Sequence, residues 1–195
     1  MGWLRRRRWG AAESEAALPG IAAVPWDSLQ ADTGRPAVKV PALLVSLVLD
    51  EGRKDLRDRL GGELGASTRF WAPVTPHAVP FLLRVAQDQG HPRGAWIAQV
   101  LLSELVYGEW FGDDPTLPAR MAAAFEAGRP FYEELLRTGD RSDKAMAIET
   151  LAGMNGRTDR LRNMLANLDV DPALDRSDPL IAEALETAHR YYDDT

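Results

Sequence analysis

Val40-Pro-Ala-Leu-Leu44 and Val79-Pro-Phe-Leu-Leu83 are two copies of one short apolar pattern, separated by 39 positions along the chain. Around each copy, apolar residues recur at the spacing of a helix with a wide buried face. Proline costs little in the first turn of a helix, because its missing N–H would have no intrahelical partner there. We therefore expect both pentapeptides to open equivalent helices.

A second helical pattern follows each pentapeptide and repeats after 41 positions. The repeated residues are Leu60, Glu63 and Leu64, then Leu101, Glu104 and Leu105. A lone helix pair of about 40 residues cannot bury its apolar face, whereas stacked pairs share one core. The repeat therefore predicts stacked helix pairs.

The pattern continues less regularly toward the C-terminus. A weaker third copy runs from Arg129 to Leu151, after an expected inserted loop and helix over residues 108–127. A last helix is expected from Pro179 to about Tyr192.

The composition is typical of one globular domain. The 195 residues are 45% hydrophobic and 27% charged, with few clusters of β-branched residues that would favour strands. The chain has no cysteine, which excludes disulfides, thiolate metal sites and a cysteine nucleophile. We predict an all-α fold, with a single helical domain over residues 26–195 preceded by a basic, flexible segment over residues 1–25.

One known family resembles this pattern. The stretch Ala78-Val-Pro-Phe-Leu-Leu83, followed by the helix Ala95–Leu105, is similar to the helix pairs of bacterial HEAT-repeat proteins. The resemblance covers about residues 36–155. It implies a short right-handed α-solenoid of antiparallel helix pairs, whose second helices line a concave face that binds proteins, peptides or occasionally nucleic acids.

Charge separates the beginning of the chain from the rest. The net charge is −6 although positions 5–8 are all arginine, so removing this +4 leaves −10 for the remainder. An acidic body repels phosphate backbones, and we do not expect nucleic-acid binding. The charge instead supports the expectation of a protein partner, for example a basic one.

The basic segment allows several interpretations: a twin-arginine signal, a nucleic-acid arm, weak attachment to an anionic membrane, or a solvated mobile terminus. Its membrane-attachment candidates are Trp3, Arg5, Arg6, Arg7, Arg8 and Trp9. Glu13 and Glu15 interrupt the apolar stretch that a signal needs, and no later stretch is long enough to span a bilayer. We prefer the mobile terminus and a cytoplasmic location.

The loop Ser67–His77 carries Arg69, Phe70, Trp71 and His77. Arginine and aromatic residues on a loop are typical of interaction hot spots. The alternative, which we prefer, is a packed connector whose aromatic rings fill the space between helix pairs while Thr75 caps the next helix.

The segment Tyr107–Asp114 combines Trp110 with Asp113 and neighbouring carboxylates. It fits a cation site or a pocket cap, but its spacing lacks the alternating oxygen ligands of a calcium loop. Turn chemistry is the interpretation that we prefer. The three histidines have no ligand spacing, so we expect no metal and no cofactor.

Glu104 and Glu149 hold related positions on second helices, with Arg93 and Arg141 near the starts of those helices. This polar row fits either a ligand surface or, as we prefer, the solvated rim of the repeat.

Together these patterns favour a protein-binding module, of the adaptor or immunity type. The alternative is an enzyme on the same scaffold: a small-molecule enzyme using Trp96, Trp110 and Asp113, or a DNA-repair glycosylase, which would need a basic concave face. The candidate contact residues are Arg69, Phe70, Trp71, His77, Arg93, Trp96, Glu104, Trp110 and Asp113.

Overall fold

The computed structural model describes residues 9–50 and 55–193. Within these ranges the chain forms α-helices and one 3-10 turn, and the only β-structure is a pair of isolated bridges. The helices are α1 (Ala11–Ala17), α2 (Val40–Leu49), α3 (Leu56–Leu64), α4 (Thr75–Ala86), α5 (Pro92–Leu105), α6 (Leu117–Glu126), α7 (Arg129–Thr138), α8 (Arg141–Asn155), α9 (Asp159–Leu168) and α10 (Pro179–Asp193), with η1 at Ile21–Ala23. The all-α prediction is confirmed.

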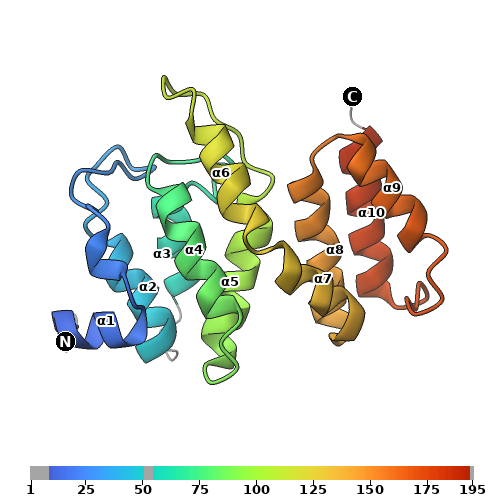
Figure 1. The fold of residues 1–195 in the computed structure, drawn as a ribbon, viewed down its shortest axis with the longest axis horizontal. Helices are drawn as coiled ribbons and strands as arrows, with labels where there is room; N and C mark the ends of the chain where they lie inside the picture. Colours follow the sequence, from blue (N-terminus) through green and yellow to red (C-terminus); the bar gives the residue numbers. More distant parts are fainter. Residues whose placement is uncertain (1–8, 51–54, 194–195) are drawn as a thin grey trace.

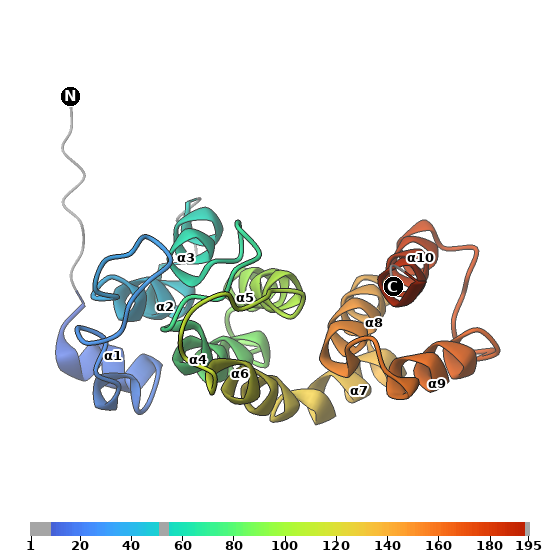
Figure 2. The same cartoon turned by 90° about the horizontal axis from the view of Figure 1, so that it is seen from above.

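Consecutive helices pair with one another. α2 contacts α3, α4 contacts α5, α7 contacts α8 and α9 contacts α10, while α6 lies against α4 between the second and third pairs (Figure 1). Seen from above, α3, α5, α8 and α10 form one layer, and α4, α6, α7 and α9 form the other (Figure 2). α8 packs against both α5 and α10, so it connects the two ends of the molecule.

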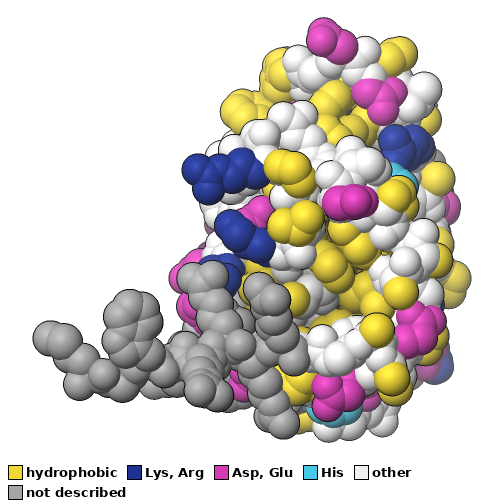
Figure 3. All heavy atoms as spheres, turned by 90° about the vertical axis from the view of Figure 1, so that its left-hand side faces the viewer, with side chains coloured by type: hydrophobic (Ala, Val, Ile, Leu, Met, Phe, Trp, Pro, Cys, Tyr) yellow, Lys and Arg dark blue, Asp and Glu magenta, His cyan; other side chains and the backbone are white. Residues whose placement is uncertain are grey.

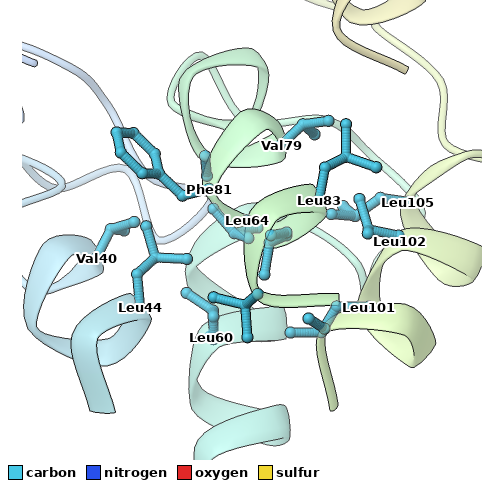
Figure 4. Close-up of a cluster of buried hydrophobic side chains, with 14 of the residues drawn as sticks. Val40, Leu44, Leu60, Leu64, Val79, Phe81, Leu83, Leu101, Leu102 and Leu105 are labelled. Carbon is cyan, nitrogen blue, oxygen red and sulfur yellow. The ribbon is translucent and has the colours of Figure 1, made fainter. Parts of the chain in front are cut away.

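The repeated leucines point into one shared core (Figure 4). The side chains that meet there are Val40 and Leu44 of α2, Leu60 and Leu64 of α3, Val79, Phe81 and Leu83 of α4, and Leu101, Leu102 and Leu105 of α5. The valine and both leucines are buried in each pentapeptide, so the repeat marks equivalent burial.

The two pentapeptides do not, however, open equivalent helices. α2 begins at Val40 with Pro41 in its first turn, whereas α4 begins at Thr75 and contains Pro80 in its interior. Pro76 takes the first-turn position of α4. The expectation of two matching openings is therefore wrong, because α4 gains one further turn before its pentapeptide.

The N-terminal segment is packed from Trp9 onward. Leu18, Ile21 and Trp26 are buried in the main core, and the Trp9 Nε1–H donates to the Ser46 Oγ at 3.3 Å. The end of the molecule that this segment covers shows apolar side chains between charged ones (Figure 3). The expected flexible segment over 1–25 is thus corrected for residues 9–25, because large side chains there bury apolar surface. Residues 1–8 lie outside the described ranges.

In the C-terminal half, α6 falls within the insertion expected over 108–127, α7 and α8 lie where the third copy was expected from Arg129 to Leu151, and α10 matches the helix expected from Pro179 to about Tyr192. The sequence pattern did not predict α9. A smaller core joins α8, α9 and α10 through residues such as Ile148, Leu165 and Ile181. In the part of the chain that is described, no helix combines the length and apolar character needed to cross a bilayer.

Candidate functional site

A cleft of about 860 Å³ opens on the layer formed by α3, α5, α8 and α10. Its N-terminal wall comes from α3, α5 and the adjoining loops, and its C-terminal wall comes from α8, α10 and the α8–α9 turn. The lining residues are Arg57, Asp58, Gly61, Ala66, Ser67, Thr68, Arg69, Phe70, Ser103, Glu104, Tyr107, Glu109, Glu149, Arg157, Thr187, Arg190 and Tyr191. Four arginines and four carboxylates balance each other in this lining.

The α3–α4 loop reaches the cleft because α3 stops abruptly. Gly65 ends the helix at φ +85°, and a Cβ at that position would overlap the Phe70 carbonyl oxygen. Only glycine adopts this conformation at low cost, and here it also allows the loop to fold back closely. Arg69 follows with a positive φ of 59° and an exposed side chain.

The two loops that the sequence singled out lie side by side. The Trp71 N–H donates to the Glu109 carbonyl at 2.8 Å, and the Glu109 N–H donates to the Arg69 carbonyl at 2.9 Å. The Trp71 indole N–H donates to the Leu105 carbonyl at 2.7 Å. Trp71 is therefore the packed connector that we preferred, and it fixes the α3–α4 loop against the end of α5.

Phe70 behaves differently from Trp71. Its side chain is 49% exposed and meets Phe111, 73% exposed, in an edge-to-face contact with ring centroids 5.1 Å apart. This pair stands at the rim of the cleft on the N-terminal wall. Trp110, the neighbour of Phe111, packs against the main core instead.

The charges that α3 and α5 contribute to the N-terminal wall are paired with one another. Arg57 of α3 forms an ion pair with Glu104 of α5 and a second with Asp58 at 3.6 Å. Each of these side chains is partly exposed to solvent. The Arg57–Glu104 pair joins neighbouring second helices across the floor of the cleft.

The C-terminal wall carries the Glu149 carboxylate. This carboxylate is half-buried, and no hydrogen bond or ion pair to it occurs within residues 9–50 and 55–193. Burial, followed by the charge of Glu183 on α10, raises the pKa of the Glu149 carboxyl above its usual range. The ionised form is therefore poorly stabilised in the free protein.

Two tyrosines meet beside the backbone of Glu149. The Tyr107 hydroxyl donates to the Glu149 backbone carbonyl at 2.7 Å, and its ring meets Tyr191 edge to face at 4.8 Å. Burial raises the pKa of the Tyr107 hydroxyl far above neutral pH, so it stays a donor. These contacts join α5, α8 and α10 at one point.

The arginines of the C-terminal wall are engaged elsewhere. The Arg157 Nε donates to the Tyr191 backbone carbonyl at 2.9 Å, and its guanidinium lies over the Tyr191 ring at 5.1 Å. Arg190 pairs with Glu186 at 2.6 Å along α10. Neither arginine neutralises Glu149.

Besides the two core tryptophans already described, four of the predicted contact residues lie outside the cleft lining. His77 lies in the first turn of α4, where its Nε2 accepts from Arg120 at 2.6 Å. Desolvation, followed by the Arg120 charge, lowers the pKa of the His77 imidazole. Arg93 and Asp113 are exposed on other parts of the surface, and Trp96, 55% exposed, lies near the start of α5.

The residues expected for a small-molecule enzyme are not assembled. Trp96 is near the start of α5, and Trp110 comes after its end. About 14 Å of helix lies between Trp96 and the last residue of α5. Asp113 is exposed in the next loop, outside the cleft lining. The predicted grouping therefore fails, because Trp96 lies near the start of α5 whereas Trp110 and Asp113 lie beyond its other end.

Thr75 does not cap α4 as expected. Val74 is the residue that precedes the helix, and the buried Thr75 hydroxyl instead accepts from the Ala72 N–H at 3.0 Å and donates to the Leu64 carbonyl at 2.8 Å. It ties the linker to the end of α3. Asp114 confirms the expected turn chemistry, since its Oδ1 accepts from the Thr116 N–H at 2.9 Å.

The polar row is partly brought together. Glu104 and Glu149 both line the cleft, whereas Arg93 does not and Arg141 pairs with Asp178 at 3.5 Å. The sequence did not single out the contact between a tyrosine of α5 and one of α10. Tyr107 lay in the segment singled out before Trp110, but nothing in the sequence connects it to Tyr191, 84 positions later.

Among the described residues, no group of three or more acidic or histidine side chains is arranged to hold a metal ion. Comparisons with known protein families, with curated protein sequences and with solved structures found no match to this chain.

Proposed function

We propose that this chain is a protein-binding module, built as a short right-handed HEAT-like α-solenoid, whose cleft holds a segment of a partner polypeptide. The observation that carries this proposal is the make-up of the cleft. Its lining is mainly charged and hydroxyl-bearing, with both signs of charge present. Pockets for small molecules are lined mostly by apolar side chains, so this lining suits a polypeptide better.

Three features of the cleft support the proposal. Its volume lies toward the upper end of the range for ligand sites. Within the described residues, charged side chains without an ion-pair partner remain on both walls, Arg69 on one and Glu149 on the other. The exposed Phe70–Phe111 pair provides an aromatic anchor at the rim, of the kind enriched at protein interfaces.

The acidic character of the body, with a net charge of −6 for the whole chain, favours a partner with a basic segment. The cleft itself carries as many carboxylates as arginines, which is unlike the strongly basic groove that a nucleic-acid backbone needs. Membrane attachment is not part of the proposal. Trp9 is partly buried and hydrogen-bonded to Ser46, while Trp3 and Arg5–Arg8 lie outside the described residues.

Affinity capture from a lysate of the source cells tests the proposal. Ser103→Tyr places a bulky ring on the floor of the cleft, and Glu133→Tyr adds the same ring to an exposed position of α7 outside the cleft. We expect a protein that Ser103→Tyr loses and Glu133→Tyr retains. A benzophenone amino acid at position 187 should cross-link that protein, and one at position 133 should not. Equal capture by both variants would remove the cleft from the proposal.

A further inference from the structure

The Glu149 carboxylate is the strongest unmet charge in the cleft. It projects from the third turn of α8, lines the cleft and is half-buried, without a cation beside it in the described part of the chain. The charge that raises its pKa further is that of another carboxylate, Glu183. A buried charge is costly unless it is paired, so a bound cation would stabilise this site.

The protein's own cations do not fill this role. Arg157 donates to the Tyr191 carbonyl and stacks on its ring, Arg190 pairs with Glu186, and Arg57 pairs with Glu104. Each of these arginines is therefore already engaged by a group other than Glu149. A cationic group from outside the chain can therefore pair with the Glu149 carboxylate.

The surroundings of Glu149 also suit a cation. Tyr107 lines the cleft next to Glu149, and aromatic rings attract Arg and Lys side chains through their π-electrons. The Tyr107 hydroxyl is committed to the Glu149 backbone carbonyl, which holds the ring against α8. The Tyr107 hydroxyl therefore does not donate a hydrogen bond to the Glu149 carboxylate.

We infer that Glu149, beside Tyr107, forms a cation subsite in the cleft that takes an arginine or lysine side chain of the bound polypeptide. This inference rests on the proposed function and adds the chemistry of one anchoring residue. The carboxylate pairs with the cationic group, and the Tyr107 ring contacts its alkyl stem.

Fluorescence anisotropy with a labelled, acetylated and amidated (Gly-Arg)3 peptide tests the subsite. Glu149→Gln should weaken binding about tenfold, as expected for loss of one charge-assisted hydrogen bond. Glu133→Gln makes the same change of net charge at an exposed position of α7 outside the cleft and should stay within about twofold of wild type. A peptide with citrulline in place of arginine should bind as weakly to wild type as the arginine peptide binds to Glu149→Gln.

Misfolding does not confuse the result, because Glu149→Gln removes a poorly solvated charge and its melting temperature should equal or exceed that of wild type. Equal weakening by Glu149→Gln and Glu133→Gln would overturn the subsite, since only overall charge would then be attracting the peptide. If free agmatine competed as effectively as the unlabelled peptide, the inference that the cation belongs to a polypeptide would be overturned.

The same assay separates the subsite from the proposed function. Loss of peptide binding in Ser103→Tyr but not in Glu149→Gln leaves the cleft as the binding surface and overturns the subsite. The subsite is also overturned, and the cleft retained, if wild type fails to bind the peptide but still captures a partner that cross-links at position 187. Failure of both the capture and the peptide assay overturns both proposals.

Discussion

The two walls of the cleft use charge in opposite ways. On the N-terminal wall, Arg57 pairs with Glu104 and Asp58, so much of the charge there serves contacts between helices. On the C-terminal wall, Glu149 has no cationic partner within the described residues, although arginines lie on the same wall. Charges that the fold has already paired contribute little to recognition, whereas an unpaired, half-buried charge gains most from a ligand.

The largest expected effects come from the two cores behind these walls. Leu101→Ala empties a fully buried position of the main core, and Leu165→Ala empties a buried position of the smaller core. Each should lower the free energy of unfolding by about 3 kcal/mol, within the usual range for a buried leucine. Urea denaturation measures both changes, with Glu133→Ala as an exposed control.

The same variants test whether the walls unfold together. All six tryptophans lie at or before position 110, so tryptophan fluorescence reports on the N-terminal half while circular dichroism reports on all helices. α8 contributes Leu151 to the main core and Ile148 to the smaller one, so the two signals should share one midpoint. A Leu165→Ala protein whose dichroism shifts without its fluorescence would show two separate folding units.

Next in size is a glycine comparison at the contact between the walls. A Cβ on Gly153 of α8 would overlap Val106 at the end of α5, whereas a Cβ on Gly62 of α3 meets open space. Gly153→Ala should destabilise the protein by about 1–3 kcal/mol through overpacking. Gly62→Ala should stabilise it by about 0.5–1 kcal/mol through helix propensity. Thermal denaturation that shifts both variants in the same direction would contradict the close α5–α8 contact.

Replacing each of two glutamates of the cleft by glutamine should change stability by smaller amounts and in opposite directions. Glu104→Gln removes a partly exposed ion pair and should cost about 0.5 kcal/mol at neutral pH. Glu149→Gln removes an unpaired charge and should raise the melting temperature at neutral pH. Thermal denaturation of both variants in one buffer measures the difference, and a lower melting temperature for Glu149→Gln would show that its charge has a partner.

The difference in stability between Glu149→Gln and wild type should depend on pH. Because the pKa of folded Glu149 lies above its ordinary value of 4.5, the folded protein takes up this proton before the unfolded chain does. The resulting stabilisation is complete below pH 4.5 and is lost as the pH rises through the folded pKa. The advantage of Glu149→Gln over wild type should therefore shrink on acidification, with Glu133→Gln as the matched control. An advantage independent of pH would contradict the raised pKa.

The smallest effect is expected at His77, outside the cleft. Its folded pKa lies below the ordinary value of 6.5, so the unfolded chain binds this proton first as the pH falls. The stabilisation is present above pH 6.5 and is lost on acidification through the folded pKa. His77→Gln keeps an acceptor for Arg120 and should lose less stability than wild type between about pH 7 and 5, measured by urea midpoints. A steeper loss in the variant would contradict the lowered pKa.

Local patterns in the sequence predicted the helices well where burial follows a short period. The repeated leucines of α2, α3, α4 and α5 are buried as their spacing indicated, and α6, α7, α8 and α10 lie near their expected ranges. The N-terminal segment was predicted wrongly, because its charged beginning suggested solvation while Leu18 and Ile21 pack on the core. The helix α9 was missed because it lies outside the repeated pattern, although Leu161, Leu165 and Leu168 follow helical spacing.

The candidate site was predictable only in part. The loop with Phe70 was noticed in the sequence, and Glu104 and Glu149 were placed in one polar row, but nothing in the sequence connected that loop to the row. Trp96 and His77 were included because aromatic and ionisable residues are common in sites, yet neither lines the cleft. His77 belongs to α4, which lies in the other layer, and the arrangement of the layers depends on tertiary packing.

By itself the sequence determined that this protein is helical, that its leucines repeat and that it lacks thiol chemistry, since propensity, periodicity and composition act over short distances or over none. The tertiary structure alone decided that the turn at Trp71 pairs with Glu109, that Tyr107 meets Tyr191, and that Glu149 lacks, within the described residues, the partner that Glu104 has. Those outcomes depend on how distant helices pack, and the free energy of packing belongs to the whole assembly of side chains.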